Sequence, residues 1–267
     1  MNEAQPGLGS TYIVLRSVGK ELRPLISRLQ KVQEIGTALS AEHDLKDLLA
    51  LILKGSRELT NADSGSIFIR MDDIERVPHA TGKDRITRET PYLFLKVAQN
   101  DSIQFPFKEM RLPFNQKTIA GHVAVSGEIV NLSDVYTIPA TAPFSYSTAF
   151  DEASGYRCKS MLGVPMRNRR GEIIGVIQLI NKKKDPAVRL DSKERVGREV
   201  TAFDGFDEEF VISLASQAAV CVEKAKLVED VEHLFEGMVN SFTLALERRN
   251  RTTYGHCMRV AKYAVAI

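Results

Sequence analysis

The chain has 267 residues, of which 43% are hydrophobic and 26% charged, and its formal net charge is +2. These values are typical of a globular protein with one large domain, or an ordinary domain with flanking elements. The basic residues are spread along the sequence, which argues against a nucleic-acid-binding surface. No apolar stretch approaches the ~18 residues of a membrane span. Residues 1–10 lack the pattern of a secretory signal.

Cysteine usage indicates a reducing compartment. Cys158, Cys221 and Cys257 are far apart in the sequence, odd in number, and form no CxxC pair. Neither a disulfide framework nor a structural zinc site is therefore expected. We expect a cytoplasmic location as the default for such a chain.

The N-terminal part of the chain predicts helices. Residues 1–19 show little pattern and are expected to be flexible. Residues 20–42 predict an amphipathic helix whose apolar positions alternate three and four apart, interrupted at Gly36, and whose narrow stripe favours pairing with a second copy. Asp44 is a typical N-cap for a following helix through Leu59. The apolar positions of the first helix are Leu22, Leu25, Leu29, Val32 and Leu39.

The middle of the chain is richer in strands. Residues 64–70 and 92–98 predict extended segments, separated by the polar, charged stretch 71–90. Residues 116–126 predict a short helix, and residues 128–132 another strand. This alternation of short strands and helices predicts a mixed α and β domain.

A hairpin follows, formed by residues 157–166 and 172–181 around a turn-like sequence at 168–171. In its second strand, Ile177 and Leu179 face one way while Val176 and Ile180 face the other. Both faces are apolar, which predicts a central strand covered on both sides. Gln178 is the polar exception, and its buried amide needs hydrogen-bond partners, either on a neighbouring strand or on a bound ligand.

A long helix is expected from Phe206 to Leu246, because no proline interrupts it. Its apolar stripe keeps three-four spacing with one three-residue slip. The two interpretations are a helix packed on its own domain and a dimeric signalling helix, and its length favours the second. The stripe comprises Leu214, Ala218, Cys221, Ala225, Val228, Val231, Phe235, Met238 and Phe242.

Residues 119–124 and the motifs between Asp134 and Lys182 resemble the GAF domains of cyclic-nucleotide phosphodiesterases and adenylyl cyclases. The motifs are Asp134-Val-Tyr136, Phe150-Asp151, Gly155-Tyr156-Arg157, Ser160, Leu162, Pro165 and Gly175-Val-Ile-Gln-Leu-Ile-Asn181-Lys182. The resemblance implies an α+β fold over residues 43–228. We expect an antiparallel sheet of about six strands with helices on both faces, plus long N- and C-terminal helices.

The family also carries a signature that begins with Asn-Lys and ends with Phe, three residues and Asp-Glu. Its counterparts here are Asn181, Lys182, Phe203, Asp207 and Glu208, with a longer insertion than usual between the two halves. In relatives the Lys and the Asp form an ion pair that braces the domain. We expect the same pair between Lys182 and Asp207, because a Lys on an inner strand is costly without a partner.

The resemblance also implies a ligand pocket. Backbone groups of the short helix would meet a phosphate, aromatic and acidic side chains would line the purine side, and a glutamine would form the floor. The alternative roles are a helix turn, an N-cap and ordinary core aromatics. Ala98 stands where such domains often place an aromatic residue, which weakens the nucleotide interpretation. The ligand-binding candidates are Ala120, Gly121, Asp134, Tyr136, Phe150 and Gln178.

Other GAF ligands leave other marks. Bilin-binding relatives need a thiol beside a pocket histidine, and no Cys-His dipeptide occurs here. A haem or iron centre would use His79 or His122, although a lone histidine is more often structural. We therefore keep a cyclic nucleotide or another small molecule as the expected ligand, and a haem or iron sensor as an alternative.

The last segment resembles the opening of HD-GYP domains, which are metal-dependent phosphodiesterases that hydrolyse cyclic di-GMP. In residues 229–267, Glu247 and His256 occupy metal-ligand positions, and Asn250 stands where the family has Asp. A site that holds two or three metals needs more ligands than these two. We therefore expect no catalytic residues and no hydrolysis in the chain as given, and a divalent metal only in a complete HD-type domain.

Together these features predict a regulatory, small-molecule-sensing GAF module. A dimeric helix would transmit its ligand state to an HD-GYP-type output domain. The implied activity of the larger protein is cyclic di-GMP phosphodiesterase. The alternative is a ligand-free GAF dimerisation scaffold. A homodimer through the N- and C-terminal helices is expected in either case.

Overall fold

The computed structural model describes residues 44–77, 85–104 and 110–249, together with the single positions 33, 36, 259 and 263. Residues 1–221 form one compact unit and residues 222–267 a second. Gln33 and Gly36 are helical, and the rest of the segments expected at 1–19 and 20–42 lies outside the described residues. Over the described ranges, no helix has the length and apolar character needed to cross a membrane.

Helix α2, Leu45–Thr60, begins where the sequence predicts. The Asp44 carboxylate accepts hydrogen bonds from the backbone N–H groups of Lys46 and Asp47, which satisfies two donors at the start of the helix. The helix ends at Asn61, whose φ of 56° is in the left-handed region that commonly ends helices. Its inner face buries leucine and isoleucine side chains, including Leu49, Ile52 and Leu53.

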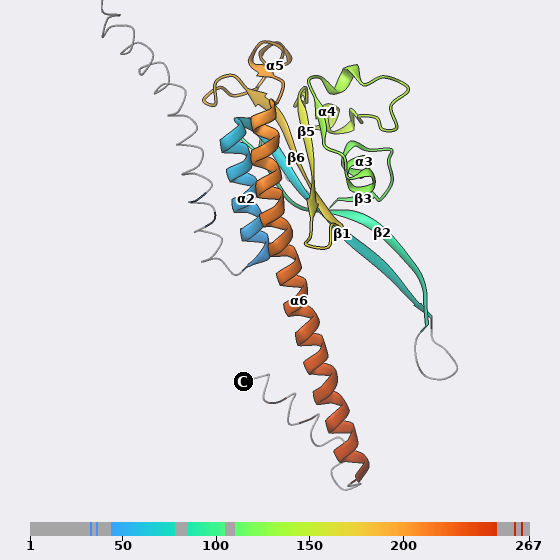
Figure 1. Cartoon of the computed structure of the whole chain (residues 1–267). Helices are drawn as coiled ribbons and strands as arrows, with labels where there is room; N and C mark the ends of the chain where they lie inside the picture. Colours follow the sequence, from blue (N-terminus) through green and yellow to red (C-terminus); the bar gives the residue numbers. More distant parts are fainter. Residues whose placement is uncertain are drawn as a thin grey trace, which may run out of the picture. The chain divides into compact units, whose positions relative to one another are not determined.

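One antiparallel sheet forms the centre of the first unit (Figure 1). Six strands follow the order β3-β2-β1-β6-β5-β4, which confirms the expected antiparallel sheet, and the two-residue β7 adds to it by pairing with β6. The strands are β1 Ala62–Val77, β2 Arg85–Asn100, β3 Arg111–Pro113, β4 Val130–Leu132, β5 Met161–Arg167, β6 Ile173–Lys183 and β7 Val200–Thr201.

The charged stretch at 71–90 corrects one prediction. It was expected to separate two strands, but β1 continues to Val77 and β2 begins at Arg85, with Met71 paired to Tyr92 and Val77 to Arg85. The two strands therefore form a long hairpin. Backbone pairing does not need an apolar side chain at every second position, so strand pairing can extend where the sequence has lost its apolar alternation.

Strand β6 is the central strand that its sequence predicts, because it pairs with β1 on one side and β5 on the other. On one face, Leu179 and Leu53 of α2 converge on Gly65, where an added Cβ would lie 2.9 Å from both side chains. On the other face, Val176 and Ile180 join an apolar cluster with helix α3, Ile119–Ser126. The expected β5–β6 hairpin is present, although β5 begins at Met161 rather than at residue 157.

Helices cover both faces of the sheet, as expected. Figure 1 shows α2 on one side, and α3 and α4 on the other. The remaining short elements lie in the connections between strands. They are the 3-10 helix η1 Val135–Thr137, α4 Ala149–Ser154 and α5 Lys193–Glu199.

Helix α6, Gly205–Arg249, matches the long helix expected from the sequence. Its residues up to 221 belong to the first unit, where Val211, Leu214 and Ala218 are buried. The later part of the apolar stripe, within the second unit, is exposed on this chain. Val231, Phe235, Met238 and Phe242 are each more than half exposed. The stripe thus consists of a buried part and a part without a partner on the described chain.

Candidate functional site

A cavity of about 430 Å³ lies beside η1 in the first unit. Its wall is mostly the irregular segment 138–148, which is attached to the start of α3 by a hydrogen bond from the Ser145 N–H to the Lys117 carbonyl. Small-molecule pockets typically have 300–1,000 Å³, so the volume suits a small ligand. The lining residues are Lys117, Val135, Tyr136, Ile138, Pro139, Ala140, Ala142, Pro143, Phe144, Ser145, Tyr146 and Thr148.

Two tyrosines of this wall share one carboxylate. Tyr136 and Tyr146 donate their hydroxyl hydrogen bonds to the two oxygens of Asp151, each at 2.5 Å. The backbone N–H of Cys158 donates a third hydrogen bond to Asp151 at 3.0 Å. The tyrosine rings meet edge to face, with centroids 5.6 Å apart. This arrangement fixes both rings and leaves their carbon surfaces available at the cavity.

The local environment keeps the phenols and the nearby thiol protonated. Burial, and then the hydrogen bond to Asp151, raise the pKa of Tyr136 to about 12. Burial also raises the pKa of Tyr146 and of the Cys158 thiol far above their ordinary values. All three groups are therefore neutral at physiological pH, and none is an activated nucleophile.

Cations lie at two places beside the tyrosines. The Arg157 guanidinium lies 4.8 Å from the centre of the Tyr136 ring, within the range of a cation–π interaction. Lys117 is part of the cavity wall. Aromatic surface together with a lysine suits a planar ligand that carries negative charge.

Ala120 and Gly121, the residues of α3 that are expected to contact a phosphate, lie outside the lining of this cavity. Ala120 belongs to the buried apolar cluster, and the Gly121 N–H donates to the Thr118 side chain, which caps the helix at 3.0 Å. An added Cβ at Gly121 would lie 2.1 Å from the Asn115 carbonyl oxygen, so close packing accounts for this glycine. Neither Ala120 nor Gly121 lines the cavity beside η1.

The other predicted ligand residues also have structural partners. Asp134 caps η1 by accepting a hydrogen bond from the Tyr136 N–H. Phe150 packs against the buried Tyr156 ring. The Gln178 amide nitrogen contacts the sulfur of Met161 on the neighbouring strand, at 2.6 Å. Of the six ligand-binding candidates, only Tyr136 lines the cavity.

The ion pair expected from the family signature is present. Lys182 Nζ contacts the buried carboxylate of Asp207 and lies 2.7 Å from Asp204. Burial lowers the pKa of Lys182, but the hydrogen bonds to the two carboxylates outweigh that effect and raise it. Lys182 therefore joins strand β6 to the start of α6 through a charged pair.

The remaining signature residues also link these elements. Asn181 has a φ of 59°. Its side chain accepts from the Lys159 N–H and donates to the Arg157 carbonyl, which fixes the chain before β5. Phe203 is buried, and Glu208 accepts a hydrogen bond from the Asn131 side chain at 2.7 Å. The signature thus acts as a brace.

The histidine alternatives concern His79 and His122. His122 is buried, its ring lies 4.7 Å from that of Phe144, and its Nε2 is 3.7 Å from a Glu128 oxygen. Within residues 44–77, 85–104 and 110–249, no group of three His, Cys, Asp or Glu side chains is placed to hold a metal ion. His79, His256 and the side chain of Glu247 lie outside the described residues.

Sequence reasoning missed Tyr146, Phe144 and Lys117. The segment 138–148 has no regular spacing of apolar residues. It forms a cavity wall because it is held against the residues that precede α3. Its only signal is composition, since it places two aromatic residues among proline, alanine, serine and threonine.

The chain has a mixed α and β fold with a cavity beside η1, and comparison with known proteins identifies its family. The sequence profile of the GAF domain matches residues 44–222. The chain therefore belongs to the GAF domain family.

Individual relatives agree with this membership. The "Dual 3',5'-cyclic-AMP and -GMP phosphodiesterase 11A" of Takifugu rubripes is 34% identical over 128 residues, which cover 48% of this chain and 14% of that protein. Among solved structures, the GAF domain of a Coxiella burnetii phosphoenolpyruvate-protein phosphotransferase has a TM-score of 0.52 and 20% identity, covering 77% of this chain and 98% of that one. The GAF domain of the Acinetobacter phosphoenolpyruvate-protein phosphotransferase has a TM-score of 0.51 and 18% identity, covering 76% of this chain and 96% of that one. These structures show the fold.

Proposed function

We propose that the chain is a regulatory GAF module that senses a small planar molecule in the cavity beside η1. The observation that carries this proposal is the 430 Å³ cavity whose wall holds Tyr136 and Tyr146, positioned by Asp151. A cyclic nucleotide is the first ligand to test, because a phosphodiesterase named for cyclic AMP and cyclic GMP is 34% identical over 128 residues.

Each part of the wall has a role in this proposal. The tyrosine rings stack on or flank the planar part of the ligand, and their hydroxyls stay on Asp151. Arg157 lies against the Tyr136 ring, so it holds the ring and adds positive potential. Lys117, which also lines the cavity, attracts an anionic group of the ligand.

Titration calorimetry with cyclic AMP and cyclic GMP tests this role, using the Tyr136→Ala variant. Removal of one stacking ring weakens binding by about tenfold or more. Tyr92→Ala is the matched control, because Tyr92 also lies beneath an arginine, with the Arg111 guanidinium 4.6 Å from its ring. That control binds as the wild type does. Equal loss in both variants, or no binding to the wild type, contradicts the proposal for these ligands.

The proposed route of transmission is α6. Its exposed apolar stripe in the second unit is suited to a second copy of the same stripe, which would form a dimeric signalling helix. A ligand that binds two helix poses with different affinity shifts their populations. We propose that this shift is the signal passed to the next domain.

Light scattering with stripe variants tests the dimer. Phe235→Glu places a charge within the stripe, where pairing would bury it, and is expected to convert the dimer to a monomer. Leu244→Glu is the matched control, because Leu244 is 58% exposed on the opposite side of the helix. A monomeric wild type, or the same mass for both variants, would contradict the proposal of a dimeric signalling helix.

The proposed output is an HD-GYP-type phosphodiesterase domain that begins in residues 229–267. It rests on the resemblance of this segment, with Glu247 and His256 at metal-ligand positions. The test is metal binding and hydrolysis of cyclic di-GMP by this chain joined to a complete HD-type domain. Lack of metal binding and turnover in a folded longer protein would contradict this output.

A ligand-free scaffold is the second candidate function, and one observation favours it. Five of the six expected ligand positions serve caps, core packing or strand contacts. Mass spectrometry of small molecules extracted from the purified dimer, with the binding assay above, separates the two. A dimer that carries no small molecule and binds no tested ligand supports the scaffold.

A further inference from the structure

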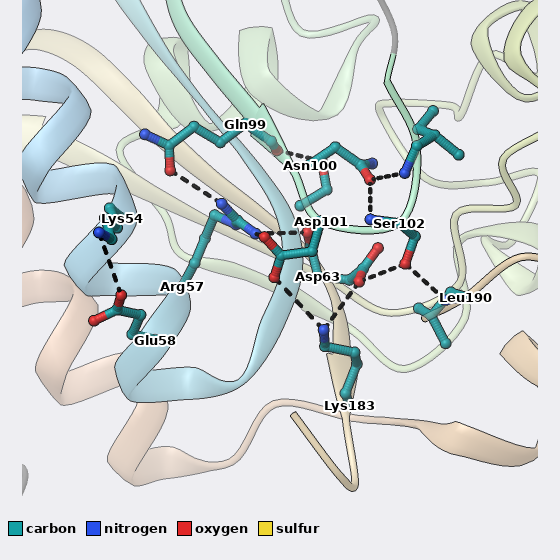
Figure 2. Close-up of polar contacts among 12 residues, drawn as sticks. Lys54, Arg57, Glu58, Asp63, Gln99, Asn100, Asp101, Ser102, Lys183 and Leu190 are labelled. Carbon is teal, nitrogen blue, oxygen red and sulfur yellow. Dashed lines mark hydrogen bonds and ion pairs between the residues drawn. The ribbon is translucent and has the colours of Figure 1, made fainter. Parts of the chain in front are cut away.

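A second cavity, of about 440 Å³, lies at the end of α2 and shares no lining residue with the cavity beside η1. Figure 2 shows charged side chains from α2, β1, β6 and the segment after β2 that converge here. The lining residues are Lys54, Arg57, Glu58, Asn61, Ala62, Gln99, Asp101, Lys183 and Pro186.

Two buried cations face this cavity. The Arg57 side chain is 9% exposed and that of Lys183 is 3% exposed. Arg57 donates to the Gln99 side chain at 3.0 Å and to the Asp63 carbonyl at 2.9 Å. Its Nε is buried and has no hydrogen-bond partner. A buried guanidinium with spare donor capacity is costly unless an anion compensates it.

Among the described residues, one buried acidic residue contacts these two cations. Asp63 is fully buried, and one of its oxygens lies 3.1 Å from Lys183 Nζ and accepts from the Ser102 hydroxyl at 2.7 Å. Its other oxygen accepts from the Tyr156 hydroxyl at 2.7 Å. Both oxygens of Asp63 are thus engaged by groups of the domain interior.

The second counter-ion is an exposed side chain. Asp101 contacts the Arg57 guanidinium and lies 3.6 Å from Lys183 Nζ, yet its side chain is 53% exposed. It follows β2 and lines the cavity, and Figure 2 shows it in contact with both Arg57 and Lys183. Because water already reaches this carboxylate, rotation away from the cations leaves the carboxylate solvated. The cost falls on the buried Arg57 and Lys183, which then need another anion.

We propose that this cavity binds a small oxyanion, a phosphate or a carboxylate group, in exchange for the Asp101 carboxylate. When Asp101 rotates away, Arg57 and Lys183 keep a net charge of one against Asp63, and the incoming oxyanion takes the vacated contacts. The C-terminal end of α2 opposes an anion with about half a charge. The remaining net charge of one exceeds that opposition, and Arg57 offers the planar donor geometry that oxyanions prefer.

The test is a titration of the full chain with inorganic phosphate, and separately with acetate, at constant ionic strength. Amide chemical shifts of Asn61, Asp101 and Lys183 report the site. In the wild type these shifts change and saturate. Asp101→Asn removes the internal competitor, so the same probe binds about tenfold tighter or more. The acetate and phosphate arms show which oxyanion is preferred.

Asp191→Asn is the matched control, because it removes the same charge from an exposed pair, in which Asp191 lies 2.7 Å from Arg195. It binds the probes as the wild type does. Equal affinities of the Asp101 and Asp191 variants, or shifts that never saturate in the wild type, overturn the proposal. The wild-type titration decides the matter if the Asp101 variant does not fold. The outcome is independent of ligand binding beside η1.

Discussion

Tyr156→Phe tests the buried polar network of the first unit most directly. Tyr156 is 1% exposed, and its hydroxyl donates at 2.7 Å to one oxygen of the fully buried Asp63. Phenylalanine keeps the ring and removes only the donor. The contacts from Ser102 and Lys183 are to the other oxygen of Asp63, so they do not replace it.

The expected cost follows from that unpaired oxygen. A buried hydrogen bond to a charged group contributes about 1.5–3 kcal/mol, so we expect the free energy of unfolding to fall by about 2 kcal/mol. For a domain of this size each kcal/mol lowers Tm by about 2–4 °C. A decrease of about 4–8 °C is therefore expected.

The assay is urea unfolding of the full chain at fixed protein concentration, followed by circular dichroism. Tyr136→Phe is the control, because its hydroxyl makes the same kind of bond to Asp151 while the residue is 44% exposed. Water replaces that lost donor, so the control loses about 0.5 kcal/mol or less. If Tyr156→Phe costs no more than the control, the bond to Asp63 does not stabilise the fold.

Further predictions follow from single contacts. Gly121→Ala places a Cβ 2.1 Å from the Asn115 carbonyl oxygen, so we expect a loss of about 1–3 kcal/mol in the same unfolding assay. Asp44→Ala removes the cap of α2 and is expected to cost about 1 kcal/mol, whereas Asp44→Ser largely retains it. The folded state holds the Tyr136 proton more tightly, because its pKa is raised from 10.0 to about 12. The free energy of unfolding therefore falls as the pH rises across that interval, and it falls less steeply in Tyr136→Phe. The urea midpoint measured at several pH values tests this dependence.

The sequence was sufficient for elements whose causes are local. The Asp44 cap, the β5–β6 hairpin and the two-sided strand β6 depend on residues close in sequence or on a short apolar pattern. The Lys182–Asp207 pair came from the family motif and was also expected from the cost of an unpaired inner-strand lysine. These features require no knowledge of the whole fold.

Features set by distant contacts were missed or misplaced. The charged continuation of β1 and β2 has no apolar alternation, so strand pairing there could not be inferred from side chains. The cavity wall depends on the bond between Ser145 and Lys117, which joins segments without regular structure. The sequence indicates that the Gln178 amide needs a partner but not which one, and the contact with Met161 depends on the register of the neighbouring strand.

The geometry of the two tyrosines leads to a last prediction, about specificity. Their hydroxyls already donate to Asp151, so the wall offers ring surface more than free hydrogen-bonding groups. Stacking on aromatic rings tolerates different bases, whereas a site built to read hydrogen bonds rejects a wrong partner by several orders of magnitude. If cyclic nucleotides bind, we expect cyclic AMP and cyclic GMP to differ by less than about tenfold in dissociation constant. A much larger preference in calorimetry would mean that Asp151 releases a tyrosine and contacts the base itself, and Asp151→Asn would then abolish the preference.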